Sequence, residues 1–229
     1  MIDVKNFYNE LQKNGIDFFA GVPDSLLKNI CAFITANTPA EKNIITANEG
    51  AAVALGTGYH LATNKIPLIY MQNSGIGNAV NPLMSLADKE VYSIPMILLI
   101  GWRGEPGVKD EPQHIKQGRV SPALLNSMEI PYQVLDENSD YSNVIDEAVK
   151  TAQSASAPVA ILVRKGTFDS FSLKQENNEE AELTREEALE QVLPFIPTDA
   201  VVVSTTGMLS RELFELREKY NQSHQTDFL

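Results

Sequence analysis

The sequence has few of the residues that build disulfides or metal centres: one cysteine, three histidines and one tryptophan among 229 residues. The single Cys31 excludes an intramolecular disulfide, and the cysteine and histidines do not have the spacing of a metal site. Cys31 stands beside Ala32 and Phe33 in a predicted helix, which favours a small buried side chain over a nucleophile. The chemistry of the chain must therefore come mainly from carboxylates, amides and scattered cations.

Positive charge is also scarce, with 18 Lys and Arg residues against 30 Asp and Glu residues and a formal net charge of -12. Nucleic acids and anionic membranes are bound through a positive field, so neither is expected as a partner. An anionic ligand would need a local cluster of cations. The amino terminus lacks the apolar segment of a signal peptide, and no apolar run is long enough to span a bilayer, so we expect a cytoplasmic protein.

Short apolar runs alternate with segments of helical or loop character along the first three quarters of the chain. Strands are expected at residues 17–20, 43–46, 66–71, 96–100, 132–135 and 159–163. Such alternation is typical of an α/β fold, in this case a doubly wound parallel sheet with helices on both faces.

The composition changes after residue 171. Residues 174–182 are polar and acid-rich without apolar periodicity, so residues 172–183 are expected to be a linker between a first domain, 1–171, and a second segment, 184–229. In that segment, Thr184 and Glu187 resemble a capping box, residues 200–204 a buried strand and residues 208–216 a helix. One strand and two helices are too few for an independent sheet domain, so this segment is expected to be the truncated start of a second α/β domain.

Glu49 stands between a predicted strand and a helix rich in very small residues, 50–58. In a parallel α/β sheet that junction lies at the carboxyl ends of the strands, where ligands bind, so Glu49 is a candidate for proton chemistry. The alternative is structural, because acids in the first turn of a helix often only complement the positive end of its dipole.

Two further turns follow predicted strands. Asp24, in the turn 21–25, is either a helix N-cap or a polar group presented to a ligand, and these roles are compatible. Residues 73–82 contain glycines that allow close backbone approach to a ligand, but Val80 replaces the last glycine of a dinucleotide fingerprint. A nicotinamide or flavin dehydrogenase is therefore disfavoured.

Residues 101–119 form an unusually long connection after an apolar strand, which is a candidate functional loop. Its cations could bind an anionic substrate, and His114 could also move protons near neutral pH. The alternative is a solvated loop, since acids offset most of the positive charge. The cations are Arg103, Lys109, Lys116 and Arg119, and the acids are Glu105, Asp110 and Glu111.

These segments together resemble the thiamine-diphosphate-dependent decarboxylases over essentially the whole chain. The glutamate tract, residues 48–58, carries the resemblance to the superfamily. The Gly-Val-Pro-Asp-Ser turn at 21–25 and the Asp-Glu-Pro-Gln-His run at 110–114 narrow it to the phosphonopyruvate decarboxylase branch, with sulfopyruvate decarboxylase as a near relative.

The resemblance implies that the first domain is of the pyrimidine-binding type and that Glu49 hydrogen-bonds the aminopyrimidine of thiamine diphosphate and promotes its imino tautomer. It also implies decarboxylation of a small anionic 2-oxo acid, phosphonopyruvate, to phosphonoacetaldehyde and carbon dioxide. By the same resemblance, further residues have expected roles: Asp24 and His114 in catalysis, Asn73, Gly75 and Asn78 in cofactor binding, and Ser25, Arg103, Lys109 and Lys116 in substrate binding.

The chain departs from the family pattern because it contains no Gly-Asp-Gly metal motif. No metal ligand is expected in this chain, and the Mg²⁺ ligands are expected outside it, which predicts an inactive fragment that needs a homo-oligomer or a partner diphosphate-binding domain. Three alternatives stay open: a non-catalytic module of the same fold, the larger half of a split enzyme, and a sulfopyruvate decarboxylase, because phosphonate and sulfonate are both tetrahedral anions.

Overall fold

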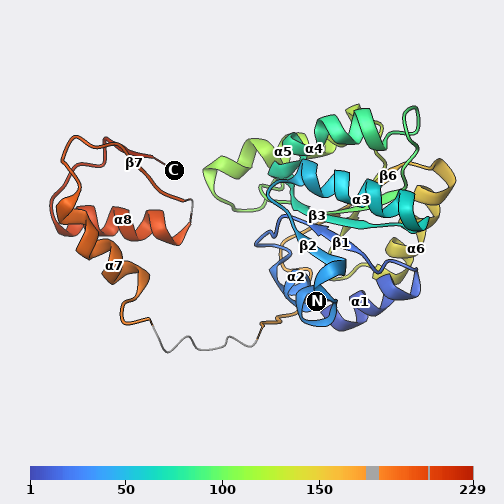
Figure 1. Ribbon diagram of the computed structural model, residues 1–229, viewed down its shortest axis with the longest axis horizontal. Coiled ribbons are helices and arrows are strands. Elements are labelled where there is room, and N and C mark those ends of the chain that lie inside the picture. Colours follow the sequence, from blue (N-terminus) through green and yellow to red (C-terminus); the bar gives the residue numbers. More distant parts are fainter. Residues whose placement is uncertain (174–180, 206, 229) are drawn as a thin grey trace. The chain divides into compact units, whose positions relative to one another are not determined.

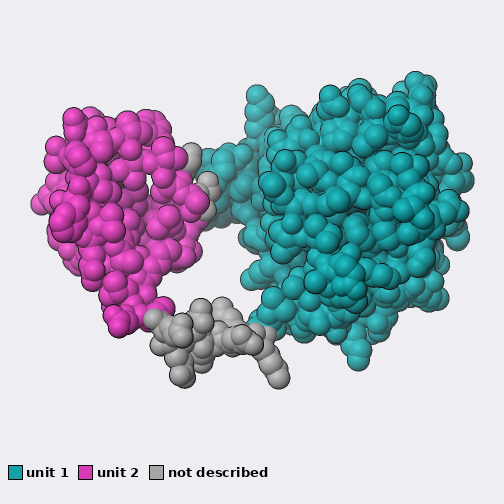
Figure 2. Space-filling model, viewed as in Figure 1, with its two compact units in different colours: residues 1–173 teal, residues 174–229 magenta. Residues whose placement is uncertain are grey.

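The computed structural model of the protein describes residues 1–173, 181–205 and 207–228. The chain divides into two units, Met1–Leu173 and Lys174–Leu229 (Figure 2). Residues 174–180, which include most of the expected linker, lie outside the described residues, as does Thr206 in the turn after the expected strand at 200–204.

A six-stranded parallel sheet forms the centre of the first unit (Figure 1). Its order is β2-β1-β3-β4-β6-β5, and its strands are β1 (Phe19–Gly21), β2 (Asn43–Ile45), β3 (Leu68–Gln72), β4 (Met96–Gly101), β5 (Tyr132–Leu135) and β6 (Pro158–Val163). The predicted doubly wound α/β sheet is therefore confirmed.

Helices cover both faces of this sheet (Figure 1). One face packs against α1 (Val4–Lys13), α2 (Lys28–Asn37) and α6 (Tyr141–Ala155), and the other against α3 (Glu49–Thr63), α4 (Ile76–Pro82) and α5 (Pro112–Ser127). Short helical turns add η1 (Ala40–Lys42), η2 (Asn73–Gly75) and η3 (Leu83–Ala87).

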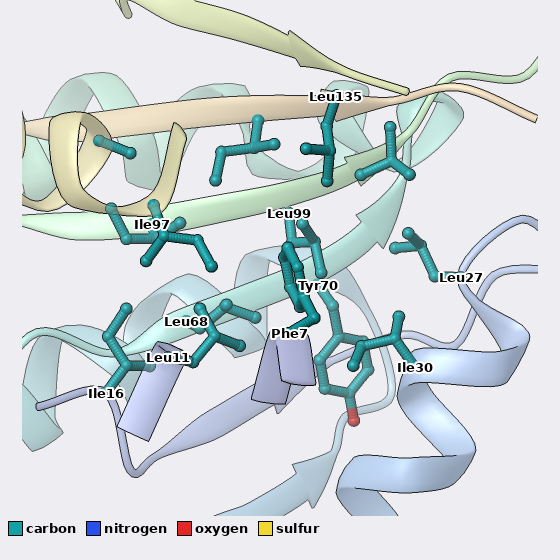
Figure 3. Close-up of a cluster of buried hydrophobic side chains, with 14 of the residues drawn as sticks. Phe7, Leu11, Ile16, Leu27, Ile30, Leu68, Tyr70, Ile97, Leu99 and Leu135 are labelled. Carbon is teal, nitrogen blue, oxygen red and sulfur yellow. The ribbon is translucent and has the colours of Figure 1, made fainter. Parts of the chain in front are cut away.

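Alternate residues of each central strand enter opposite layers, as the period of a strand requires. In β4, Ile97 and Leu99 belong to the layer under α1, α2 and α6, whereas Leu98 and Ile100 belong to the layer under α3, α4 and α5. Figure 3 shows the first layer, which contains Leu99 from β4, Phe7 and Leu11 from α1 and Ile30 from α2. Cys31 is buried in this layer, which confirms the prediction of a small buried side chain, and burial raises the pKa of its thiol to about 12.

One expectation about a connection was wrong. Residues 101–119 are not a single loop, because α5 begins at Pro112 and only residues 102–111 lack regular structure. Proline is favoured in the first turn of a helix, where its missing N–H is not needed. The apolar pattern of the sequence does not change at Pro112, so it does not show where α5 begins within this long connection.

The second unit contains α7 (Arg185–Val192), η4 (Leu193–Phe195), β7 (Val202–Val203), α8 (Met208–Lys219) and β8 (Asp227–Phe228). The predicted capping box of Thr184 and Glu187 is present. The expectation of a single strand was wrong, because β8 pairs in parallel with β7. A two-residue run beside the end of the chain is too short to show strand periodicity in a sequence.

None of the helices in the described ranges is long and apolar enough to cross a membrane.

Asp17 joins the amino-terminal ends of three strands of the sheet. Its carboxylate accepts hydrogen bonds from Lys42 Nζ at 2.7 Å, just before β2, and from Lys65 Nζ at 3.0 Å, before β3. It also accepts one from the Tyr59 hydroxyl on α3. Burial alone would raise the pKa of the Asp17 carboxyl, but these three hydrogen bonds outweigh it and hold the pKa far below its usual range.

We expect Asp17→Asn to lower the free energy of unfolding by about 1–2 kcal/mol at pH 7, because the charge-assisted bonds are lost at a partly solvated site. A depressed pKa stabilises the fold fully above the unfolded-state value of about 4, and this stabilisation is lost progressively as the pH falls from that value through the lower folded-state pKa. The difference between the two proteins should therefore shrink below about pH 4. Urea unfolding at pH 7 and pH 3 measures it, with exposed Glu90→Gln as the control. A deficit of equal size at both pH values contradicts the assignment.

Candidate active site at the carboxyl edge of the sheet

Four chain segments that the sequence marked as functional leave the same edge of the sheet. They are the turn after β1, the start of α3 after β2, the η2–α4 segment after β3 and the loop after β4. The strands are parallel, so their carboxyl ends share one edge, and β2, β1, β3 and β4 lie side by side in the sheet. In doubly wound sheets, ligands bind at this edge.

Glu49 is the first residue of α3 and is buried, with 8 % of its surface exposed. The helix is capped by Asn48, whose side chain accepts from Ala51 N at 2.9 Å. Glu49 Oε2 accepts a hydrogen bond from Asn78 Nδ2 at 2.8 Å, whereas Oε1 accepts none from the described residues. The residue stands where a helix dipole favours an acid, but the dipole does not require the burial or the amide partner. One carboxylate oxygen is fixed and the other is available to a ligand.

Gly75 provides the space for this carboxylate. A Cβ atom on Gly75 would lie 2.2 Å from Glu49 Oε1, closer than any real contact allows. Gly50 plays a similar part between the helices, because a Cβ there would lie 2.9 Å from the carbonyl oxygen of Asn78. Gly75 was expected to bind the cofactor. In the structure, its lack of a side chain leaves the space that the Glu49 carboxylate occupies.

Asn73 is buried and committed to protein partners. Its Nδ2 donates to the Arg103 carbonyl at 2.8 Å and to Ser121 Oγ at 3.0 Å, and its Oδ1 accepts from the Arg103 N–H at 3.0 Å. Both amide N–H groups are used in these bonds. The geometry assigns Asn73 to holding the loop after β4 against β3 and α5, rather than to a direct cofactor contact.

Asp24 is only 5 % exposed. Its Oδ2 accepts from the Leu26 N–H at 2.9 Å, and its Oδ1 is buried without a hydrogen-bond partner in the described part of the chain. Burial raises the pKa of this carboxyl. Asp24 is not the N-cap of α2, because the helix begins at Lys28 and Leu27 occupies the cap position. Of the two roles expected for Asp24, the polar group presented at the edge of the sheet is the one that its position permits.

Arg103 is held by neighbours on both sides. Its Nε donates to Asp110 Oδ2 at 2.8 Å, and its Nη1 donates to Ser25 Oγ at 2.7 Å. Hydrogen bonds from Arg103 hold the pKa of the Asp110 carboxyl far below its usual range. Asp110 also accepts from the Gly104 N–H at 2.8 Å. The guanidinium is thus paired within the loop, and its role in substrate binding, which the resemblance implied, stays a prediction. The sequence indicated Asp110 as an offsetting charge and as part of the 110–114 run, without a role in the site.

His114 is in the first turn of α5 and is half-buried. Burial, followed by the nearby Arg103, lowers the pKa of its imidazole, so the ring is neutral at pH 7 and can accept a proton. The ring makes no hydrogen bond with another described residue. Lys109 and Lys116 are exposed and form no ion pair within the described ranges. Those ranges also contain no group of three His, Cys, Asp or Glu side chains that could hold a metal ion.

Asp24→Asn should make the protein more stable at neutral pH by about 1 kcal/mol, because it removes a buried charge that lacks one of its partners. A carboxyl whose pKa is raised on folding destabilises the folded state as the pH rises above the unfolded value of about 4. The advantage of the variant should therefore grow from pH 4 to pH 8. Denaturant unfolding across this range tests it, and a variant that is less stable at pH 8 would show that the charge is compensated.

The chain is similar to a known protein family and to known decarboxylases. The family described as "Thiamine pyrophosphate enzyme, N-terminal TPP binding domain" matches residues 4–125. The chain is 31 % identical to the phosphonopyruvate decarboxylase of Streptomyces viridochromogenes, with 96 % of this chain and 58 % of that protein covered. It is 35 % identical to the sulfopyruvate decarboxylase subunit alpha of Methanocaldococcus jannaschii, with 68 % of this chain and 89 % of that subunit covered.

Solved structures show the same fold. A putative thiamin diphosphate-dependent enzyme from Mycobacterium smegmatis superposes with a TM-score of 0.56 at 18 % identity, covering 88 % of this chain and 38 % of that chain. The benzoylformate decarboxylase from Polynucleobacter necessarius gives 0.54 at 17 % identity, covering 85 % and 36 %. The family predicted from the glutamate tract is confirmed: the chain belongs to the thiamine pyrophosphate enzymes and carries their N-terminal TPP binding domain.

Proposed function

We propose that this chain supplies the pyrimidine-binding part of a thiamine-diphosphate-dependent decarboxylase that acts on a 2-oxo acid with a second anionic group. The preferred substrate is phosphonopyruvate, which would give phosphonoacetaldehyde and carbon dioxide. The observation that carries the proposal is the buried Glu49 carboxylate, whose Oε2 is fixed by Asn78 while its Oε1 is left to accept or share a proton.

The residues present fit the ring end of the cofactor. Thiamine diphosphate, when bound, supplies the electron sink for loss of carbon dioxide. Glu49 would hold a proton shared with a nitrogen of the aminopyrimidine, Asn78 would keep the carboxylate in place, and Gly75 would leave room beside it. Because Asn78 already holds the Glu49 carboxylate in place, the carboxylate need not rearrange when charge develops in the transition state.

Asp24 and His114 are suited to handling protons next to the reacting carbon. A carboxyl with a raised pKa is more often protonated and can donate, whereas a neutral imidazole can accept. The positive charge of Arg103 acts to lower the pKa of both groups. We assign proton transfer to Asp24 and His114, and positioning of the loop to Arg103.

The diphosphate end requires groups beyond those in the described residues, and we propose that a diphosphate-binding domain with Mg²⁺ supplies them. The chain spans 58 % of the length of the phosphonopyruvate decarboxylases it matches. Three sulfopyruvate decarboxylase relatives are named as alpha subunits and match 68 % of this chain. On this basis residues 1–171 form the pyrimidine-binding domain, and a longer chain or a separate subunit completes the site. Exposed Leu55 and Leu61 on α3, the helix of Glu49, support a further protein surface there.

A sulfonate analogue is the second candidate substrate. Relatives of both types match at similar identity, 31 % for a phosphonopyruvate decarboxylase and 31–35 % for sulfopyruvate decarboxylase alpha subunits. Both distal groups are tetrahedral anions that the same cations can bind. The preference for phosphonopyruvate depends on the longer match along this chain.

The direct test measures carbon dioxide release from phosphonopyruvate and from sulfopyruvate, with thiamine diphosphate and Mg²⁺. The 229-residue chain is compared with the same chain supplemented by a diphosphate-binding domain of a relative. Release only from the supplemented sample supports the proposal, and the faster substrate identifies the distal anion. No release from either substrate in the supplemented sample would favour a non-catalytic module.

In the supplemented enzyme, Glu49→Gln should lower the turnover number by roughly 10²–10⁴-fold, because an amide cannot share the proton that the carboxyl holds. The fold should be retained, since Asn78 can still pair with the amide oxygen. Exposed Glu41→Gln, in η1, is the matched control and should leave turnover unchanged. Circular dichroism verifies folding, and undiminished turnover in Glu49→Gln would disprove the role of Glu49.

A further inference from the structure

A cavity of about 420 Å³ opens beside the candidate site, between the loop after β4 and the turn after β6. Its lining consists almost entirely of charged side chains: Arg103, Lys109, Asp110, Glu111 and Lys165, with Pro112 at the start of α5. Three cations around one cavity are notable in a chain whose net charge is -12. The volume is within the range of small-molecule sites.

The three cations are not equivalent. Arg103 is paired with Asp110, as described above, and its third nitrogen is bound to Ser25. Lys109 and Lys165 are exposed, and neither forms an ion pair with another residue in the described ranges. The two lysines are therefore the cations of the cavity that have no ion pair in the described ranges, and Glu111 adds one negative charge to the same lining.

Both lysines stand on segments whose backbones are fixed. Lys165 follows β6 in a turn where Gly166 has a φ of +81°. The Thr167 hydroxyl donates to the Arg164 carbonyl at 2.8 Å and closes this turn. Lys109 directly precedes Asp110, whose carboxylate is bound to Arg103 and to the Gly104 N–H. The two ammonium groups therefore approach one cavity from two anchored segments, which an ion pair between Arg164 Nε and Glu105 Oε1 at 2.8 Å joins.

We infer that Lys165 and Lys109 form a subsite for a tetrahedral oxyanion, the distal phosphonate or sulfonate of the substrate. This inference rests on the proposed function and replaces Arg103 by Lys165 as the substrate cation. Lysine ammonium groups act as point charges with rotatable donors, which suits an anion whose oxygens are arranged tetrahedrally. Lys165 escapes sequence reasoning because it lies about 60 residues from the loop that it faces, and no motif surrounds it.

The test uses stable probes without cofactor: 3-phosphonopropanoate, 3-sulfopropanoate and propanoate, titrated into the 229-residue chain by calorimetry. The two probes with a distal anion should bind and propanoate should not. Lys165→Met and Lys109→Met should each weaken binding roughly tenfold, the effect of losing one charged hydrogen bond. Lys150→Met on α6, an exposed lysine paired with Glu147, is the matched control and should bind like the parent chain.

Comparing the phosphonate probe with the sulfonate probe shows which distal anion the subsite prefers. Tighter binding of the phosphonate above its second ionisation supports a subsite for a dianion, whereas equal binding of both probes supports one for any tetrahedral anion. Equal affinity of propanoate, or lysine variants that bind like the parent, would overturn the inference. Since these readouts involve no turnover, probe binding without decarboxylation would refute the proposed function and leave the subsite intact.

Discussion

The burial of Glu49 under Gly75 is the constraint on which the candidate site depends. A side chain at position 75 would occupy the place of the carboxylate, so η2 and the start of α3 can approach only through a glycine. The carboxylate is then held by Asn78 from the helix that follows, which ties α3 to α4. The small residues of α3 also allow close packing, because they let the backbone of this helix lie close to neighbouring segments. Space and hydrogen bonding together hold the Glu49 carboxylate in place.

Most polar groups around this centre are used to fix the backbone. Asn73 binds both main-chain groups of Arg103, and the Arg103 side chain binds Asp110 and Ser25, so segments after three different strands form one network. Asp24 is the exception, because one of its oxygens is buried without a partner. A native fold tolerates such a group where chemistry needs a carboxyl that is not fully stabilised as an anion.

The sequence was sufficient for the parts of the structure that depend on local pattern. The six strands of the sheet follow from apolar runs, and Glu49 could be placed because it stands between a strand and a helix of small residues. The pairing of Arg103 with Asp110 and Ser25 could not be predicted, since Ser25 is 78 residues away and hydroxyl partners leave no periodic signal. The start of α5 and the short strand β8 were missed because neither changes the apolar pattern.

The arrangement of charge explains how carboxyls and lysines share one edge of the sheet. Free lysines in contact with Asp24 would stabilise its anion and lower its pKa. Arg103 is the cation whose field reaches Asp24, and its effect is smaller than that of burial. Asp110 pairs with Arg103 and so weakens the field that Arg103 exerts on Asp24, and both members of the pair line the cavity of Lys109 and Lys165. The Arg103–Asp110 pair thus lets a carboxyl retain a raised pKa close to a cavity that can attract an anion.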